Sequence, residues 1–151
     1  MLIHPDDLTD PRVHALLGSH LEEMHALSPP GSVHALPLDE LRKPDVRFWT
    51  AWSGDELLGC GALKEISPRH GEVKSMRTVP GHRRRGVGRE ILLLVVDEAR
   101  RRGYRRLSLE TGSSPAFEPG RRLYESLGFT YCEPFGDYVE DPHSVFMTRV
   151  L

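Results

Sequence analysis

A short glycine loop flanked by arginines is the feature of this sequence that most limits its fold. Arg83-Arg84-Arg85-Gly86-Val87-Gly88 follows an extended stretch, 72–79, and leads into an amphipathic stretch, 88–102. This order predicts a strand, a tight turn and the start of a helix. The N–H groups at a helix start point the same way, and the helix dipole adds partial positive charge there. Because glycine also lets a diphosphate approach the backbone, the segment is suited to bind an anion.

The loop differs from the two commonest phosphate-binding loops. No Gly-Lys-Ser/Thr sequence closes it, and Ile91 stands where a dinucleotide fingerprint needs a third glycine. Nine arginines lie between Arg83 and Arg106, whereas the net charge of the chain is 20 − 22 = −2. A local basic region in a mildly acidic chain indicates one phosphate-rich ligand rather than a nucleic acid. A solvated arginine face without a ligand is the alternative.

Length and composition limit the other possibilities. A chain of 151 residues predicts one domain, 1–151, with a substantial core. The longest apolar run, Ile91 to Val96, is too short to cross a bilayer, and no secretion signal precedes it. Cys60 and Cys132 show no metal-ligand spacing, so we expect reduced thiols, no metal site and a cytoplasmic location.

The apolar pattern predicts a mixed α/β fold. Strands at 47–53, 57–64 and 72–79 would form an antiparallel meander, and the strand–helix–strand order that follows implies a parallel, right-handed crossover. Trp49 and Trp52 would lie on opposite faces of their strand, with one of them in the core. The other expected elements are a helix capped by Thr9 or Asp10 and ended by 28–31, a short helix at 38–41, a helix at 87–102, a strand at 105–111, a helix from Pro119 to Leu127, and strands at 129–132 and 144–150.

In these elements the chain resembles the GNAT superfamily of acetyl-CoA-dependent N-acetyltransferases. The similarity spans about 47–151 and depends on three motifs: Met76-Arg77-Thr78-Val79-Pro80 with Arg83-x-x-Gly86-x-Gly88, then Leu107-Ser108-Leu109-Glu110-Thr111, then Leu123-Tyr124-x-x-x-Gly128-Phe129. The resemblance implies a single-domain GNAT-like fold in which the meander adjoins a parallel, splayed strand pair with flanking helices. One position departs from the pattern, because Phe117 replaces the asparagine that many members carry seven residues before the tyrosine.

The resemblance also implies acetyl-CoA as the cosubstrate. Its diphosphate would bind backbone N–H groups of the glycine loop, and its pantetheine arm would follow the strand at 76–78. A backbone N–H near Met76 or Arg77 would polarise the thioester carbonyl. The expected cofactor-binding residues are Met76, Arg77, Thr78, Arg83, Arg84, Arg85, Gly86, Gly88 and Arg89.

The implied reaction is direct attack of a neutral amine on the thioester. The phenol of Tyr124 would be the acid that serves the departing thiolate, the alternative being a packing residue. Glu72, which shares a strand face with Met76, and Glu110, on the neighbouring strand, are candidates for the base that takes the proton of the amine. Exposed strand carboxylates are the alternative for both, in which case a chain of water molecules removes the proton.

The acceptor is the least constrained part of the hypothesis. The expected acceptor is a primary amine of a small or amino-acid-like molecule. The alternatives are a protein lysine or N-terminus, or a non-catalytic CoA-binding sensor. We expect no nucleic-acid or membrane partner, and a homodimer through strand edges is a further alternative. Candidate substrate-binding residues are His25, Ser28, Ser32 and His34 around a proline-stiffened linker, for which an ordinary surface turn is the alternative. In the last loop, Asp137 is a further candidate, since Asp137, Tyr138 and Asp141 could attract a cationic amine.

Overall fold

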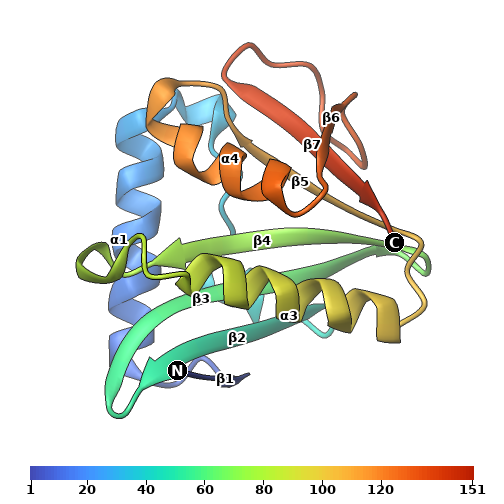
Figure 1. Cartoon of the computed structure of the whole chain (residues 1–151). Coiled ribbons are helices and arrows are strands. Elements are labelled where there is room, and N and C mark those ends of the chain that lie inside the picture. Colours follow the sequence, from blue (N-terminus) through green and yellow to red (C-terminus); the bar gives the residue numbers. More distant parts are fainter.

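A seven-stranded mixed sheet organises the chain, and helices cover both of its faces (Figure 1). The computed structural model describes all 151 residues, and the strand order is β1-β2-β3-β4-β5-β7-β6. The mixed α/β class and the predicted elements are therefore confirmed. The strands are β1 (Leu2–Pro5), β2 (Val46–Ser53), β3 (Glu56–Ser67), β4 (His70–Thr78), β5 (Arg106–Gly112), β6 (Thr130–Cys132) and β7 (Ser144–Val150), and the helices are α1 (Pro11–Leu27), α2 (Leu38–Leu41), α3 (Val87–Arg101) and α4 (Glu118–Ser126).

Strands β4 and β5 are the one parallel pair in the sheet, and they separate after a short contact. They pair only from His70 opposite Arg106 to Glu72 opposite Ser108. Beyond this contact β5 diverges from β4 toward α4 (Figure 1). A bulge in β4 accompanies the separation, since its register against β3 shifts after Lys74 and Ser75 takes a φ of 53°. A bulge bends its strand and leaves a residue unpaired, so the backbone of β4 faces open space on its β5 side.

Two hydrophobic clusters fill the two faces of the sheet. One cluster contains Trp49 together with the buried face of α3, and the other contains Trp52 together with α1 and α2. The two tryptophans thus lie on opposite faces, as predicted. Both are core residues, however, with exposures of 6% and 9%. The expectation that only one of them is core was wrong, because helices cover both faces.

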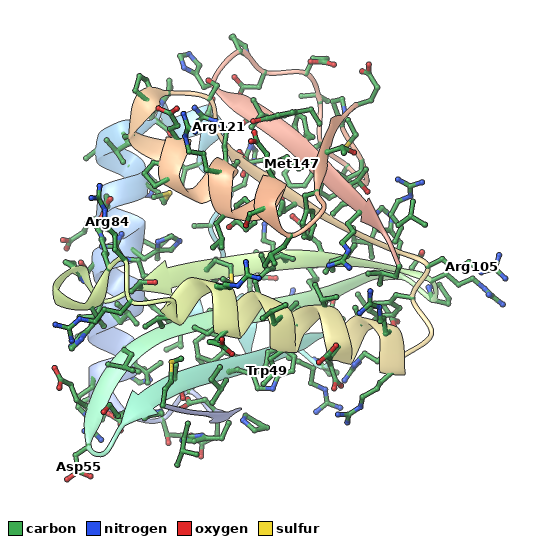
Figure 2. The ribbon with its side chains drawn as sticks, viewed as in Figure 1. Trp49, Asp55, Arg84, Arg105, Arg121 and Met147 are labelled. Atoms are coloured by element: carbon green, nitrogen blue, oxygen red, sulfur yellow. The ribbon has the colours of Figure 1, made fainter.

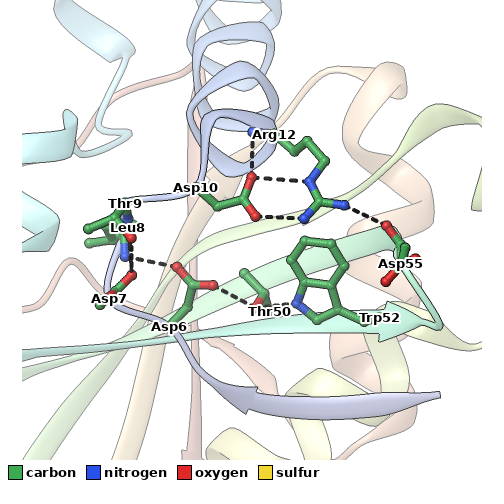
Figure 3. A network of polar contacts seen from close by, with 9 residues as sticks. All are labelled: Asp6, Asp7, Leu8, Thr9, Asp10, Arg12, Thr50, Trp52 and Asp55. Atoms are coloured by element: carbon green, nitrogen blue, oxygen red, sulfur yellow. Dashed lines mark hydrogen bonds and ion pairs between the residues drawn. The ribbon is translucent and has the colours of Figure 1, made fainter.

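The N-terminal segment adds to the layer that covers Trp52. It begins with β1, an edge strand that was not predicted and that pairs with β2. Asp10 caps α1 by accepting a hydrogen bond of 2.8 Å from the backbone N–H of Arg12 (Figure 3). The Arg12 guanidinium then lies 4.6 Å from the Trp52 ring centroid, a distance typical of a cation–π contact. This network fastens the start of α1 to the sheet, and α1 in turn forms a wall of the cleft described below.

Helix α3 approaches β3 closely because β3 carries glycines beneath it. A Cβ atom on Gly61 would come within 2.6 Å of the Ile91 side chain, and one on Gly59 within 3.0 Å of the Val87 side chain. The glycines therefore set the position of the helix start beside the end of β4. No helix in the fold has both the length and the apolar character needed to cross a bilayer.

Candidate active site

A cleft of about 570 Å³ opens where β4 and β5 separate. Its walls come from α1, the linker 28–36, β4, the glycine loop, β5 and α4. The structure brings most of the predicted site residues to this one cleft. Those that line it are Met76, Arg77, Thr78, Arg83, Arg84, Gly86, Gly88, Arg89, Glu110, Tyr124, Ser28, Ser32 and His34, whereas Glu72, Arg85, His25 and Asp137 do not.

The glycine loop presents a row of free N–H groups at one end of the cleft. Arg84 and Gly86 have φ values of 66° and 81°, and α3 begins at Val87. None of the backbone N–H groups from Arg83 to Arg89 donates a hydrogen bond within the protein. Such a turn followed by a helix start forms a concave set of donors that binds phosphate oxygens. The loop therefore suits the diphosphate of a CoA-type molecule.

The arginines near this loop do not form one continuous basic region. Arg84 and Arg105 lie at opposite ends of the molecule (Figure 2), because α3, about 22 Å long, separates them. The Arg85 side chain contacts Nδ1 of His82 at 3.2 Å, and His82 in turn contacts Glu56. The positive charge at the cleft thus comes from Lys74, Arg77, Arg83, Arg84 and Arg89, and the expectation of a single basic region from Arg83 to Arg106 was wrong.

Tyr124 projects from α4 into the same cleft. Its ring packs edge-on against Phe129, with ring centroids 6.0 Å apart. Burial, and to a lesser degree the nearby charge of Glu110, raises the pKa of the Tyr124 phenol to about 12. The phenol is therefore protonated at neutral pH and is available as a hydrogen donor.

Glu110 lies on β5, on the sheet face opposite to that of the core residue Leu109. Its carboxyl lines the cleft. Burial raises the pKa of Glu110 to about 7, while the nearby Ser144 hydroxyl and the charge of Lys74 act in the opposite direction. A carboxyl that is half ionised near neutral pH can both take and return a proton.

Glu72 occupies a different environment from Glu110, although both were predicted as candidate bases. It is 5% exposed, and the Tyr138 hydroxyl donates a hydrogen bond of 2.5 Å to its Oε2 atom. Lys74 Nζ lies 3.3 Å from the same oxygen, and also donates to the His34 carbonyl and to the Tyr138 hydroxyl, at 2.9 Å each. The lone pairs of Oε2 are therefore directed at protein groups rather than at the cleft.

Lys74 was not among the predicted site residues, and Tyr138 was considered only as one of three residues of the last loop that could attract a cationic amine. The two residues are 64 positions apart, and Tyr138 lies in a loop whose sequence shows no periodicity. Their contact arises only when the last loop folds over β4. No local signal could have identified it.

The linker 28–36, which supplies residues to the wall of the cleft, contacts the last loop, 134–143. Ser32 donates a hydrogen bond of 2.5 Å to Asp141, and the rings of His34 and Tyr138 pack edge-on with centroids 5.0 Å apart. The linker 28–36 is thus joined to the loop 134–143. His25 and Asp137 are exposed and do not line the cleft, so Ser28, Ser32 and His34 are the predicted acceptor residues that remain at the cleft.

Phe117, which departs from the family pattern, packs directly on Gly112. A Cβ atom on Gly112 would lie 2.1 Å from the Phe117 ring. The loop between β5 and α4 is also braced by Arg121 (labelled in Figure 2), which donates to the carbonyls of Gly112 at 2.7 Å and Ser114 at 2.9 Å. The ring therefore supplies an apolar section of the cleft wall where many relatives carry an amide.

Comparison with known proteins gives consistent results. The sequence model of the acetyltransferase (GNAT) family matches residues 13–129. The N-acetyltransferase YsnE of Bacillus subtilis, itself uncharacterised, is 60% identical over 151 residues, which is all of both chains. A solved structure from Klebsiella pneumoniae, assigned as an acyl-CoA N-acyltransferase, superposes with a TM-score of 0.80 at 28% identity, over 99% of this chain and 97% of the other. A GNAT acetyltransferase from Elizabethkingia anophelis, solved with acetyl-CoA bound, has a TM-score of 0.69 at 19% identity, over 99% and 97% of the two chains, and this likeness concerns the fold.

Proposed function

This chain belongs to the acetyltransferase (GNAT) family, and we propose that it transfers the acetyl group of acetyl-CoA to the primary amine of a small or amino-acid-like molecule by direct attack. One observation carries the proposal. The free N–H groups of residues 83–89, the Tyr124 phenol and the Glu110 carboxyl all belong to one cleft. Such a transfer needs a site that binds the diphosphate of the cosubstrate and two groups that transfer protons.

The roles of the two proton-transferring groups follow from their environments. Acetyl-CoA would supply an acetyl group on a thioester, a carbonyl that a neutral amine can attack. Glu110, with a pKa of about 7, takes a proton from the ammonium form of the acceptor, and the lone pair of the resulting neutral amine forms the new C–N bond. As the C–S bond breaks, Tyr124 gives its proton to the sulfur, which leaves as the thiol of CoA. The nitrogen loses its second proton as it becomes an amide, and this proton restores the phenol of Tyr124.

The backbone of β4 has a separate task in this proposal. The bulge at Ser75 leaves the strand near Met76 and Arg77 without a partner on the β5 side. A pantetheine arm is amide-containing, so it can pair with this backbone as an added strand would. One N–H there would then polarise the thioester carbonyl.

The hydrogen bond between Ser32 and Asp141 favours a small acceptor over a polypeptide. It joins the linker 28–36, which lines the cleft, to the loop 134–143, whereas a peptide substrate needs an open groove between them. A protein lysine or N-terminus is therefore the less favoured acceptor. A non-catalytic sensor would need no acid and no base at the cleft.

The test is a thiol-release assay with acetyl-CoA and a panel of amines, amino acids and short peptides. A thermal-shift measurement with CoA, with ATP as the control, precedes it. We expect stabilisation by CoA but not by ATP, and thiol release that depends on a small amine. No stabilisation by saturating CoA or acetyl-CoA would contradict the proposal.

A further inference from the structure

Three unpartnered polar groups belong to residues in the wall of the cleft. The buried side-chain atoms that have no hydrogen-bond partner are His20 Nδ1, Ser75 Oγ, Arg77 Nε and Ser144 Oγ. The first three belong to residues that line the cleft. Because buried polar atoms almost always have a partner, such a set in a cleft wall indicates a ligand group that pairs with it.

The charges around Arg77 favour an anion as that ligand group. The Arg77 side chain is 7% exposed, and its Nη1 atom pairs with Glu23 Oε2 at 2.5 Å. Arg83 Nη2 lies 3.6 Å from the same oxygen, so two guanidinium groups share one carboxylate. The remaining charge at this place is therefore positive.

His20 adds a donor rather than a further charge. Burial, with the positive charge of Arg77, lowers the pKa of His20 to about 4, so its imidazole is neutral at pH 7. A neutral imidazole can present an N–H at Nδ1, and the Ser75 hydroxyl can also donate. Each of the three unpartnered groups can thus donate a hydrogen bond.

The geometry of a guanidinium indicates which kind of anion can bind at Arg77. Arginine offers five N–H donors in a planar fork, and a carboxylate accepts two of them at once. Glu23 engages Nη1 of Arg77, and Nε has no partner. The edge of the fork that contains Nε is therefore the part left for a second anionic group.

We propose that His20, Ser75 and Arg77 bind the carboxylate of the acceptor, which makes the acceptor an amino acid rather than a simple amine. The inference rests on the proposed function, because it assigns the acceptor of that reaction. The set lies on α1 and β4, beside the linker 28–36 that borders the acceptor side. Arg77 would be a specificity-determining residue, and Glu110 would receive the proton of the amine that the carboxylate positions.

The experiment compares matched acceptors with acetyl-CoA in the thiol-release assay. The pairs are leucine with 3-methylbutylamine, phenylalanine with 2-phenylethylamine, lysine with cadaverine, and 4-aminobutyrate with propylamine. We expect kcat/KM to favour at least one acid over its decarboxylated partner by about tenfold to a hundredfold, since a hydrogen bond to a charged group is lost without the carboxylate. Arg77→Met should abolish this preference while the Kd for CoA stays within about twofold of the wild-type value.

Two further variants separate the possible outcomes. Arg77→Lys keeps the charge but not the fork, so it should retain part of the preference, and it serves if Arg77→Met does not fold. Arg47→Met, which removes an exposed strand arginine, should leave both the preference and CoA binding unchanged.

Three results would overturn the inference while leaving the proposed function intact. They are equal use of the decarboxylated amines, turnover of those amines without turnover of any acid, and an Arg77→Met variant that loses CoA affinity but keeps the preference. The last result would show that Arg77 binds a CoA phosphate instead. Absence of both CoA binding and thiol release would instead contradict the proposed function.

Discussion

Tyr138 donates a hydrogen bond of 2.5 Å to Oε2 of Glu72, and Lys74 Nζ lies 3.3 Å from the same oxygen. The two carboxylates predicted as candidates for the base, Glu72 first and Glu110 second, are therefore not equivalent. Glu72 does not line the cleft, and two protein groups hold its carboxylate. Glu110 lines the cleft and has a pKa raised to about 7. The different environments of Glu72 and Glu110 lead to separate predictions for the two residues.

Glu110→Gln should change the pH dependence of the reaction. A base acts in its deprotonated form, so kcat/KM of the wild type should rise with pH through about 7 and then level off. In the variant this rise should disappear and the plateau should fall by about 10²-fold or more. Steady-state thiol release from pH 5.5 to 9 measures both the rise of kcat/KM with pH and the height of its plateau. Glu22→Gln, an exposed change on α1, is the control, and an unchanged profile in Glu110→Gln would remove the assigned role.

The same substitution should have a pH-dependent effect on stability. Because burial raises the pKa of Glu110 to about 7, the folded state binds this proton more tightly than the unfolded state does. The carboxyl therefore favours folding at low pH, and this contribution is lost as the pH rises through about 7. Glu110→Gln should be more stable than the wild type at pH 8 by about 2 kcal/mol and equally stable at pH 4. Urea unfolding of both proteins at both pH values measures the difference in the free energy of unfolding. A variant that is less stable than the wild type at pH 8 would refute this prediction.

Tyr138→Phe should destabilise the fold through the Glu72 and Lys74 pair. The ring would keep its edge-on packing against Phe135, with centroids 5.1 Å apart, but both buried charges would lose a hydrogen-bond partner. We expect a loss of about 1–3 kcal/mol in the free energy of unfolding. Tyr131→Phe, which removes a hydroxyl bonded to Glu125 at the surface, should cost less than about 0.5 kcal/mol. Equal losses in the two variants would contradict a buried role for the Tyr138 hydroxyl.

Tyr124→Phe should lower the turnover number at least about tenfold with little change in affinity for acetyl-CoA. The substitution keeps the ring against Phe129 and removes only the protonated hydroxyl that faces the cleft. Steady-state kinetics gives kcat, and calorimetric titration with CoA gives the affinity. If kcat stayed at the wild-type value, Tyr124 would be a packing residue.

Gly86→Ala and Gly103→Ala form a matched pair that tests the glycine loop. Both glycines have φ near 80°, and a Cβ atom on either would meet no protein atom within 4 Å. Both variants should therefore lose about 1 kcal/mol of stability from backbone strain. Only Gly86→Ala should weaken CoA binding, by about tenfold or more, since its methyl group would stand where the diphosphate approaches. Similar CoA affinities in both variants would mean that the loop does not bind the diphosphate.

Much of the fold could be predicted because its signals are local. Asp10 and Pro11 mark the start of α1, and Gly103 and Gly128, with φ of 79° and 89°, follow the ends of α3 and α4. Strand β1 was not predicted because it is a four-residue edge strand, mostly exposed and ending in proline, without alternation. The bulge at Ser75 gives no signal either, since a serine with φ of 53° is imposed by the separation of β4 from β5.

The candidate site also has parts that could be predicted from the sequence and parts that could not. The glycine loop is a contiguous segment, so its role could be inferred from consecutive residues. The hydrogen bond from Ser32 to Asp141 joins residues 109 positions apart, and that from Lys74 to Tyr138 joins residues 64 apart. Contacts of this kind depend on how loops fold over the sheet. The difference between Glu72 and Glu110 therefore became visible only in the structure.

A crystal structure of this protein with CoA would test the central claim most directly. The account predicts diphosphate oxygens within hydrogen-bond distance of backbone N–H groups between Arg84 and Arg89, with the CoA sulfur directed at the Tyr124 hydroxyl. A diphosphate bound away from these N–H groups, or a sulfur remote from Tyr124, would contradict it.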